Sequence, residues 1–215
     1  MLMDMRRKPI SQKAGREQDK RGFTLTEIAI VLGIIGLILG AIWVAAAAVY
    51  NNMRTSKTTT ELLDVAQNLR AMYATAGTVD PLANTPAGFA AAAAGNANQT
   101  YMLANIFPAD TLNATQTLAQ NPWNGGIGIQ AETVTTANDS FMIAFDNVPE
   151  GPCITVITAT TGTGRDPGLS GVNVAATGAI PAYAAPAGGF PITASQAQAL
   201  CNNAFQALGF TFKLK

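Results

Sequence analysis

The sequence contains no histidine, only two cysteines and few charged residues. Among its 215 residues, 13 are Lys or Arg and 13 are Asp or Glu. Without histidine, the chain lacks the commonest general base and the commonest transition-metal ligand. The cysteines have no CxxC spacing for zinc, and no acid pair or activated nucleophile has a catalytic spacing. We therefore expect no enzyme, no metal site and no cofactor.

The few charges are distributed unevenly. Residues 1–22 hold seven basic and three acidic residues, which leaves six basic and ten acidic residues for residues 23–215, a net charge of −4. A nucleic-acid interface needs a basic stripe that neutralises phosphates. Because the larger part of the chain has an acidic excess, we expect no specific nucleic-acid partner.

Residues 28–53 form a run of 26 positions without one charged side chain. As a helix this run would be about 39 Å long, more than the roughly 30 Å hydrocarbon core of a bilayer. Basic residues precede the run, which predicts a cytoplasmic N-terminus and export of the rest of the chain. A secretory signal peptide is the competing interpretation, but the run is too long and Glu27 lies beside it.

A helical pattern continues past the apolar run. Apolar residues recur there at spacings of three and four: Leu62, Val65, Leu69 and Met72, joined by Ala66 and Tyr73. This spacing predicts one helix over residues 23–76 whose second half packs on a globular head. Two helices broken near residues 51–52 are the alternative.

The remaining residues predict strands, short helices and irregular segments. Residues 125–135 and 141–148 are strand-forming runs separated by Asn138 and Asp139, which predicts an antiparallel hairpin. Alternating apolar residues near the C-terminus predict a half-buried strand. Strand propensity extends to residues 154–158, whereas residues 161–189 have the composition of an irregular surface segment.

Two short helices are also predicted. Residues 99–107 are one candidate, ended by Pro108, and Thr193 is a candidate N-cap for a helix over residues 194–201. The two cysteines, Cys153 and Cys201, predict one disulfide in an exported chain. Two buried free thiols in a cytosolic protein are the alternative.

The junction at residues 20–40 reads KRG-FTLTEIAIVLGIIGLILG and resembles the N-terminus of type IV prepilins and the related pseudopilins. The resemblance rests on basic residues, then Gly22, an apolar Phe23, and Glu27 as the fifth residue after the glycine. It implies that a prepilin peptidase cuts between Gly22 and Phe23 and methylates the new amine of Phe23. It also implies that Glu27 docks onto the Phe23 amine of a neighbouring subunit, because an unpaired carboxylate is costly in lipid. A glutamate that merely reaches the lipid headgroups is the alternative.

Two head motifs narrow the resemblance to type IVb pilins of the PilS-like thin-pilus kind. These are IFPADTL at residues 106–112 and NPWNGGIGIQ at residues 121–130, and the long leader agrees with them. The second motif contains Pro122, Trp123, Gly125 and Gly126. We expect Trp123 to be a buried anchor, with a binding role as the alternative.

The resemblance implies an α+β type IV pilin fold, in which a long, partly transmembrane N-terminal helix packs on an antiparallel sheet and a disulfide closes the C-terminal region. The implied parts are a cleaved leader (residues 1–22), a transmembrane and filament-core helix (23–52) and a head (53–215). Within the head, Cys153 and Cys201 would enclose the D-region at about residues 153–201.

The implied function is that of a structural subunit that forms a homopolymer, an extracellular pilus used for adhesion, aggregation or conjugative mating contact. Its partners would be prepilin peptidase, an inner-membrane assembly platform with its ATPase and an outer-membrane secretin. Before assembly the subunit would lie in the bacterial inner membrane. A pseudopilin of a type II secretion system is the first alternative, and a membrane-anchored enzyme is the second.

Overall fold

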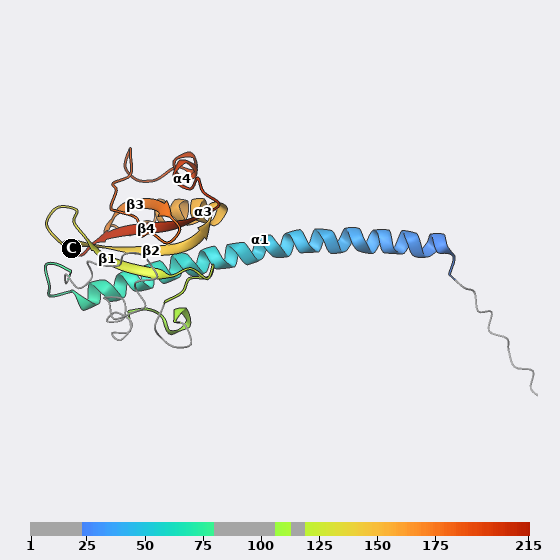
Figure 1. Ribbon diagram of the computed structural model, residues 1–215, viewed down its shortest axis with the longest axis horizontal. Helices are drawn as coiled ribbons and strands as arrows, with labels where there is room; N and C mark the ends of the chain where they lie inside the picture. Colours follow the sequence, from blue (N-terminus) through green and yellow to red (C-terminus); the bar gives the residue numbers. More distant parts are fainter. Residues whose placement is uncertain (1–22, 80–105, 113–118) are drawn as a thin grey trace, which may run out of the picture. The chain divides into compact units, whose positions relative to one another are not determined.

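The computed structural model describes residues 23–79, 106–112 and 119–215 (Figure 1). The predicted leader, including Gly22, lies outside these residues. The chain divides into two compact units, residues 1–45 and 46–215. In order, the described elements are α1 (Leu25–Met72), η3 (Ala109–Thr111), β1 (Ile127–Glu132), β2 (Ser140–Pro149), α3 (Glu150–Thr160), β3 (Leu169–Ala176), α4 (Ala194–Leu200) and β4 (Phe205–Lys213).

Helix α1 is continuous over 48 residues, so the predicted single helix is confirmed and no break occurs near residues 51–52. The helix contains no proline, and its threonines do not interrupt it. The hydroxyls of Thr55 and Thr58 donate to backbone carbonyls four residues earlier, at 3.0 and 3.1 Å. These bonds give each hydroxyl an acceptor within the helix, so the hydroxyls do not draw the backbone into another conformation.

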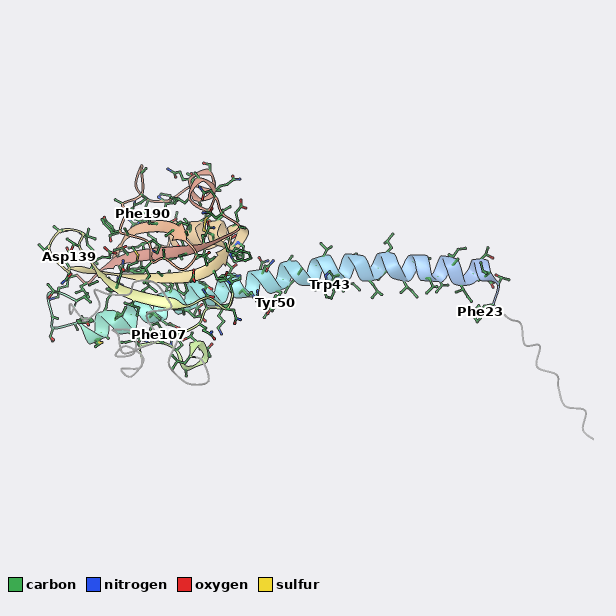
Figure 2. The ribbon with its side chains drawn as sticks, in the orientation of Figure 1. Phe23, Trp43, Tyr50, Phe107, Asp139 and Phe190 are labelled. Atoms are coloured by element: carbon green, nitrogen blue, oxygen red, sulfur yellow. A yellow bond between two sulfur atoms is a disulfide. The ribbon has the colours of Figure 1, made fainter. Side chains whose placement is uncertain are left out.

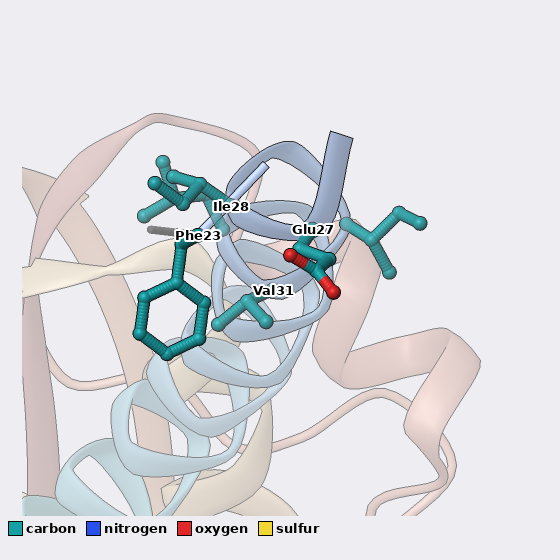
Figure 3. A pocket seen from close by; sticks show the side chains of 6 residues that line it. Phe23, Glu27, Ile28 and Val31 are labelled. Carbon is teal, nitrogen blue, oxygen red and sulfur yellow. The ribbon is translucent and has the colours of Figure 1, made fainter. Parts of the chain in front are cut away.

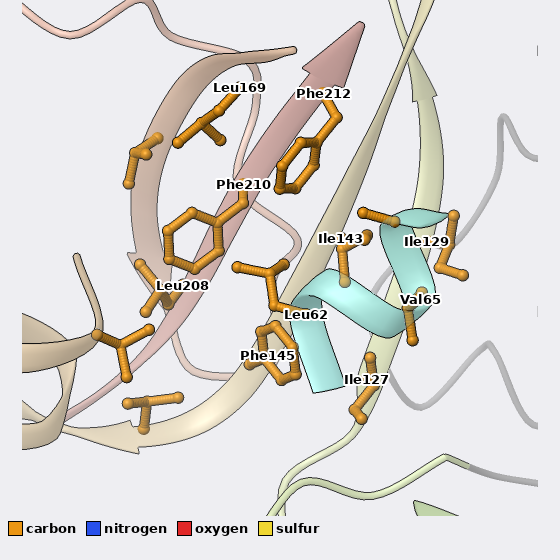
Figure 4. Close-up of a cluster of buried hydrophobic side chains, with 14 of the residues drawn as sticks. Leu62, Val65, Ile127, Ile129, Ile143, Phe145, Leu169, Leu208, Phe210 and Phe212 are labelled. Atoms are coloured by element: carbon orange, nitrogen blue, oxygen red, sulfur yellow. The ribbon is translucent and has the colours of Figure 1, made fainter. Parts of the chain in front are cut away.

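The sheet is antiparallel throughout, with strand order β1-β2-β4-β3. Strands β1 and β2 form the predicted hairpin, with Ile129 opposite Ile143. The second half of α1 packs on one face of this sheet, where Leu62 and Val65 are fully buried close to Ile143 and Phe145 (Figure 4). The predicted fold class, a long helix on an antiparallel sheet, is confirmed.

One residue of the predicted helix face lies elsewhere. Leu62, Val65, Ala66 and Leu69 are all fully buried, as their spacing predicts, but Met72 is 43% exposed. Met72 is the last residue of α1. Tyr73, the next residue and another member of the predicted face, is partly buried against the core, so the face continues to Tyr73 and excludes Met72.

Strand β4 is buried on both faces, so the prediction of a half-buried C-terminal strand was wrong. Besides Phe210, which lies in the core under α1, the intervening Gly209 and Thr211 are also buried. The segment after β3 covers this second face, because a Cβ at Gly209 would lie 3.1 Å from the Pro181 ring. The Gln130 side chain donates to the Pro181 carbonyl at 3.2 Å and helps to hold the segment there.

Residues 154–158 are helical, so the predicted strand there was wrong. They belong to α3, in which Cys153, Val156, Ile157 and Thr160 are buried at spacings of three and four. That spacing places them on one helix face. Burial of this face outweighs the strand propensity of the individual residues. The hydroxyl of Thr155 donates to the Gly151 carbonyl at 3.0 Å, as in α1.

Residues 161–189 were predicted to be irregular, and this prediction was wrong for the part that forms a strand. These residues contain β3, which pairs with β4 along the edge of the sheet and is buried at Leu169 and Val172. The predicted helix at residues 194–201 is confirmed as α4, with Thr193 as its N-cap. The helical candidate at residues 99–107 lies outside the described residues except for Ile106 and Phe107, which are not helical.

Candidate functional site

The first described residues form a capped helix start. Thr24 and Glu27 make a capping box: the Thr24 backbone N–H and hydroxyl both donate to Glu27 Oε2 at 2.8 Å, and the Glu27 N–H donates to the Thr24 hydroxyl at 3.3 Å. No hydrogen bond to Glu27 Oε1 occurs within the part of the chain that the structure describes. One carboxylate oxygen thus fixes the helix start, and the other is available (Figure 3).

The side chains that follow this capping box are exposed and apolar. The large apolar residues between Phe23 and Met53 have exposed fractions of 45–86%, and Phe23 itself is 82% exposed. Within the described ranges, α1 is the one helix long and apolar enough to cross a membrane, with a mean hydropathy of 2.8 in its most apolar window. So much exposed apolar surface needs lipid or other apolar helices around it.

The first charge after the apolar run is Arg54, which lies against Tyr50. The guanidinium Cζ is 4.2 Å from the centre of the Tyr50 ring, and Nη2 donates to the Tyr50 hydroxyl at 2.8 Å. Figure 2 shows Tyr50 on the exposed part of the helix, and 56% of its surface is accessible. An aromatic ring and a cation therefore lie together where the apolar run ends.

The residues of the NPWNGG motif form a tight turn centred on Asn121. The side-chain oxygen Oδ1 of Asn121 accepts from the N–H groups of Trp123 and Gly125 at 2.9 and 3.0 Å, and the side-chain amide donates to the Asp146 backbone carbonyl. A Cβ at Gly125 would lie 2.0 Å from the Asp146 backbone oxygen, so only glycine fits. Trp123 is 6% exposed, in agreement with the predicted buried anchor.

The neighbouring residues of the motif complete this turn. Pro122 lies within it, and Gly126 pairs with Gln120 in an isolated bridge. The Gly126 carbonyl accepts from the Asp146 N–H at 2.9 Å, which ties the turn to β2. The motif therefore has a structural role, because it connects the preceding segment to the sheet.

The C-terminal region is closed by the predicted disulfide between Cys153 of α3 and Cys201 at the end of α4. Both cysteines are fully buried. An ion pair joins the same region to α1: both terminal nitrogens of Arg70 donate to the Asp166 carboxylate, at 2.6 and 2.8 Å. The Arg70 guanidinium holds the pKa of Asp166 below its ordinary value.

A buried acid lies farther along α1, eight residues after the end of the apolar run. Glu61 is 4% exposed, and its nearest charge is Lys57, whose Nζ is 3.6 Å from Oε1. Lys57 also pairs with Asp110 at 2.8 Å and so links α1 to η3. Burial raises the pKa of Glu61 to about 7, and the attraction of Lys57 opposes that rise.

Sequence reasoning predicted the burial of Trp123 and the disulfide, which the structure contains, and its roles for Phe23 and Glu27 stay predictions. It missed three features. The first is the capping box, which the T-x-x-E spacing of Thr24 and Glu27 in the sequence already indicates. The second is the pair of Tyr50 and Arg54, and the sequence already shows Arg54 as the first charged residue after the apolar run. No local signal predicts the burial of Glu61, because burial depends on which distant segments of the chain pack over the helix.

Comparisons with known proteins cover both parts of the chain. The family model described as PilS N terminal matches residues 52–212, and the model described as prokaryotic N-terminal methylation motif matches residues 18–43. No curated protein matches.

Among solved structures, the chain is similar to a type IVb pilin from Salmonella typhi at 20% identity, over 74% of this chain and 99% of that chain, with a TM-score of 0.47. It is also similar to TcpA, a type IV pilin from the El Tor biotype of Vibrio cholerae, at 18% identity, over 74% and 98% of the two chains, with a TM-score of 0.48.

Proposed function

The chain belongs to the PilS family of type IVb pilins, and from this premise we propose that it is made as a membrane-anchored prepilin, cut between Gly22 and Phe23, and polymerised into an extracellular pilus. In this proposal residues 1–22 are the leader, residues 23–52 the transmembrane and filament-core helix, and residues 53–215 the head. The D-region at residues 153–201 is the part that the disulfide closes.

The exposed apolar side chains of α1 are the observation that carries this proposal. From Phe23 to Met53 the large apolar residues keep 45–86% of their surface exposed. Lipid covers them before assembly, and the same residues of neighbouring subunits cover them in the filament. Burying such a run stabilises each subunit by up to tens of kcal/mol, at about 25 cal/mol per Å² of apolar surface.

Glu27 supports a docking role through its two oxygens. Oε2 accepts both bonds from Thr24, so the carboxylate is held at the helix start without use of Oε1. Cleavage after Gly22 would create an ammonium group at Phe23, or a methylated one. An apolar surrounding penalises an unpaired carboxylate, and a neighbour's Phe23 amine is the cation that a polymer of identical chains offers.

The partners follow from the same proposal. Prepilin peptidase would cut and methylate the chain, and an inner-membrane platform with its ATPase would lift the helix out of the bilayer. An outer-membrane secretin would pass the growing filament, which would serve adhesion, aggregation or mating contact. The absence of a catalytic histidine is consistent with such a structural role.

Mass spectrometry of filaments sheared from the producing cells tests this proposal. We expect the chain to be present in the filaments, to begin at Phe23 and to carry one methyl group on its N-terminal amine. A surface protein that still begins at Met1 would overturn the proposal. Electron microscopy of the same cells separates the alternatives, because a secretion pseudopilin produces no long surface filaments under normal expression.

A further inference from the structure

The end of the apolar run falls at a defined depth if the helix spans a bilayer. Glu27 and Tyr50 are 23 residues apart, which corresponds to about 34 Å along a helix. The hydrocarbon core is roughly 30 Å thick. When Glu27 lies at the headgroups of one leaflet, Tyr50 and Arg54 therefore reach the headgroups of the other leaflet.

The guanidinium of Arg54 is oriented but not neutralised. Tyr50 uses its ring and its hydroxyl to hold it, at 4.2 Å from the ring centre and 2.8 Å from the oxygen. No carboxylate accepts a hydrogen bond from Arg54 within the described residues. Arg70, in contrast, gives both terminal nitrogens to Asp166. A guanidinium has five N–H donors, so most of those on Arg54 remain for an outside anion.

The order of residues along α1 indicates which anion this is. The exposed ring of Tyr50 comes first and the cation follows one turn later, on the same helix face. Trp43, which is 79% exposed, lies seven residues before Tyr50 on the same helix. Aromatic rings prefer the membrane interface, and arginine at a helix end reaches the phosphate layer, where its planar group binds phosphate with two parallel hydrogen bonds.

We infer that Tyr50 and Arg54 form a binding site for the phosphate of a lipid headgroup in the outer leaflet of the inner membrane, occupied while the subunit is stored there. This inference rests on the proposed function, since it requires that α1 spans the bilayer. The phosphate contact fixes how deeply the stored subunit lies. It must be broken when the helix leaves the bilayer.

Solid-state NMR of the full chain in vesicles tests the inference. The chain is labelled with ¹³C at arginine Cζ and reconstituted into phosphatidylethanolamine and phosphatidylglycerol in phosphate-free buffer. Carbon–phosphorus dipolar dephasing then reports arginines in contact with lipid phosphate. The chain has seven arginines, so the Arg54→Gln variant is expected to lose an amount of dephased signal per chain that equals up to about one seventh of the wild-type Cζ signal.

Arg165→Gln is the matched control. Arg165 also lies over an aromatic ring, 4.7 Å from the centre of Phe190, and donates to no carboxylate among the described residues, but it belongs to the head. Its substitution is expected to leave the amount of dephased Cζ signal per chain unchanged. An equal amount of dephased Cζ signal per chain in the wild type and in Arg54→Gln, with the chain floating together with the vesicles, overturns the inference alone. A chain that does not float with vesicles overturns the proposed function as well.

Discussion

Single polar side chains hold the turns of this fold where no regular element does. Asp139 closes the loop between β1 and β2 by accepting the backbone N–H groups of Val134, Thr135 and Thr136 at 2.8–2.9 Å. Burial alone would raise its pKa, but these donors, together with the Ser140 hydroxyl, hold the pKa well below the ordinary value. The charged form of Asp139 therefore belongs to the folded state.

We expect Asp139→Ala to lower the free energy of unfolding by about 2 kcal/mol, because three backbone donors lose a charged acceptor. The loss is measured by denaturation of the full chain in detergent. Asp146→Ala is the control, since Asp146 accepts from one backbone N–H, that of Gly178. Equal losses in the two variants would contradict the proposed role of Asp139.

The pKa of Glu61 is shifted in the opposite direction to that of Asp139, so its contribution to stability depends on pH in the opposite way. Its pKa of about 7 in the folded chain lies above the ordinary value of 4.5, so the folded state binds a proton that the unfolded state has released. Stability is therefore fully retained below pH 4.5 and falls as the pH rises toward 7. We expect Glu61→Gln to remove this fall and to stabilise the chain at pH 8 by on the order of 1–3 kcal/mol.

Thermal denaturation at pH 5 and pH 8 measures the effect of Glu61→Gln. Asp64→Gln is a suitable control, because Asp64 lies on the same helix and is exposed. Wild type and Glu61→Gln with the same dependence on pH would show that the carboxylate does not titrate in this window. The i, i+4 spacing of Lys57 and Glu61 is compatible with an ion pair on a helix surface, and it carries no sign that the acid is buried.

At the scale of elements, local pattern predicted most of the structure, and tertiary packing decided the rest. The hairpin and α4 were predicted because turn residues and an N-cap fix their ends. Helix α3 was predicted as a strand because residues 154–158 favour strands one by one. Its buried face, which includes Cys153 and Ile157, appears only when the spacing of three and four is counted over the whole segment.

The disulfide joins α3 and α4 across a separation of 48 residues. Closing a loop of this length removes chain entropy from the unfolded state, which corresponds to about 4 kcal/mol in the loop-entropy model. We expect a Cys153→Ala, Cys201→Ala double variant to lose 2–4 kcal/mol of unfolding free energy, measured by chemical denaturation. Ala197, buried in α4, offers a control in Ala197→Gly, which loosens the helix but keeps the bridge. A double variant as stable as the wild type would show that packing alone holds α3 against α4.

At the scale of the whole molecule, one helix serves two environments. The part of α1 that packs on the sheet was predictable from its spacing, because it is amphipathic. For the exposed part, the sequence predicts an apolar surrounding but does not tell lipid from neighbouring helices, because both favour apolar side chains. The cover on the second face of the sheet could not be predicted, because residues around Pro181 carry no periodic signal.

Glu27 lies at the end of the exposed part, and its two roles can be separated by substitution. Glu27→Gln keeps an oxygen that can accept from Thr24 but removes the charge that a neighbour's Phe23 amine would need. Thr24→Ala removes the cap and keeps the charge. We expect Glu27→Gln to lower the yield of sheared filaments at least tenfold, because breaking a buried ion pair costs about 3 kcal/mol or more.

Thr24→Ala is expected to lower the filament yield less than Glu27→Gln does, since a lost cap costs about 1 kcal/mol. Both variants should still be cut after Gly22, which an immunoblot for the shortened chain verifies, so that a loss of filaments reports on assembly and not on processing. Filaments at the wild-type yield from Glu27→Gln would assign the carboxylate to the cap alone. The pairing of a subunit's acid with its neighbour's new amine would then have to be abandoned, although the apolar burial of α1 would still stand.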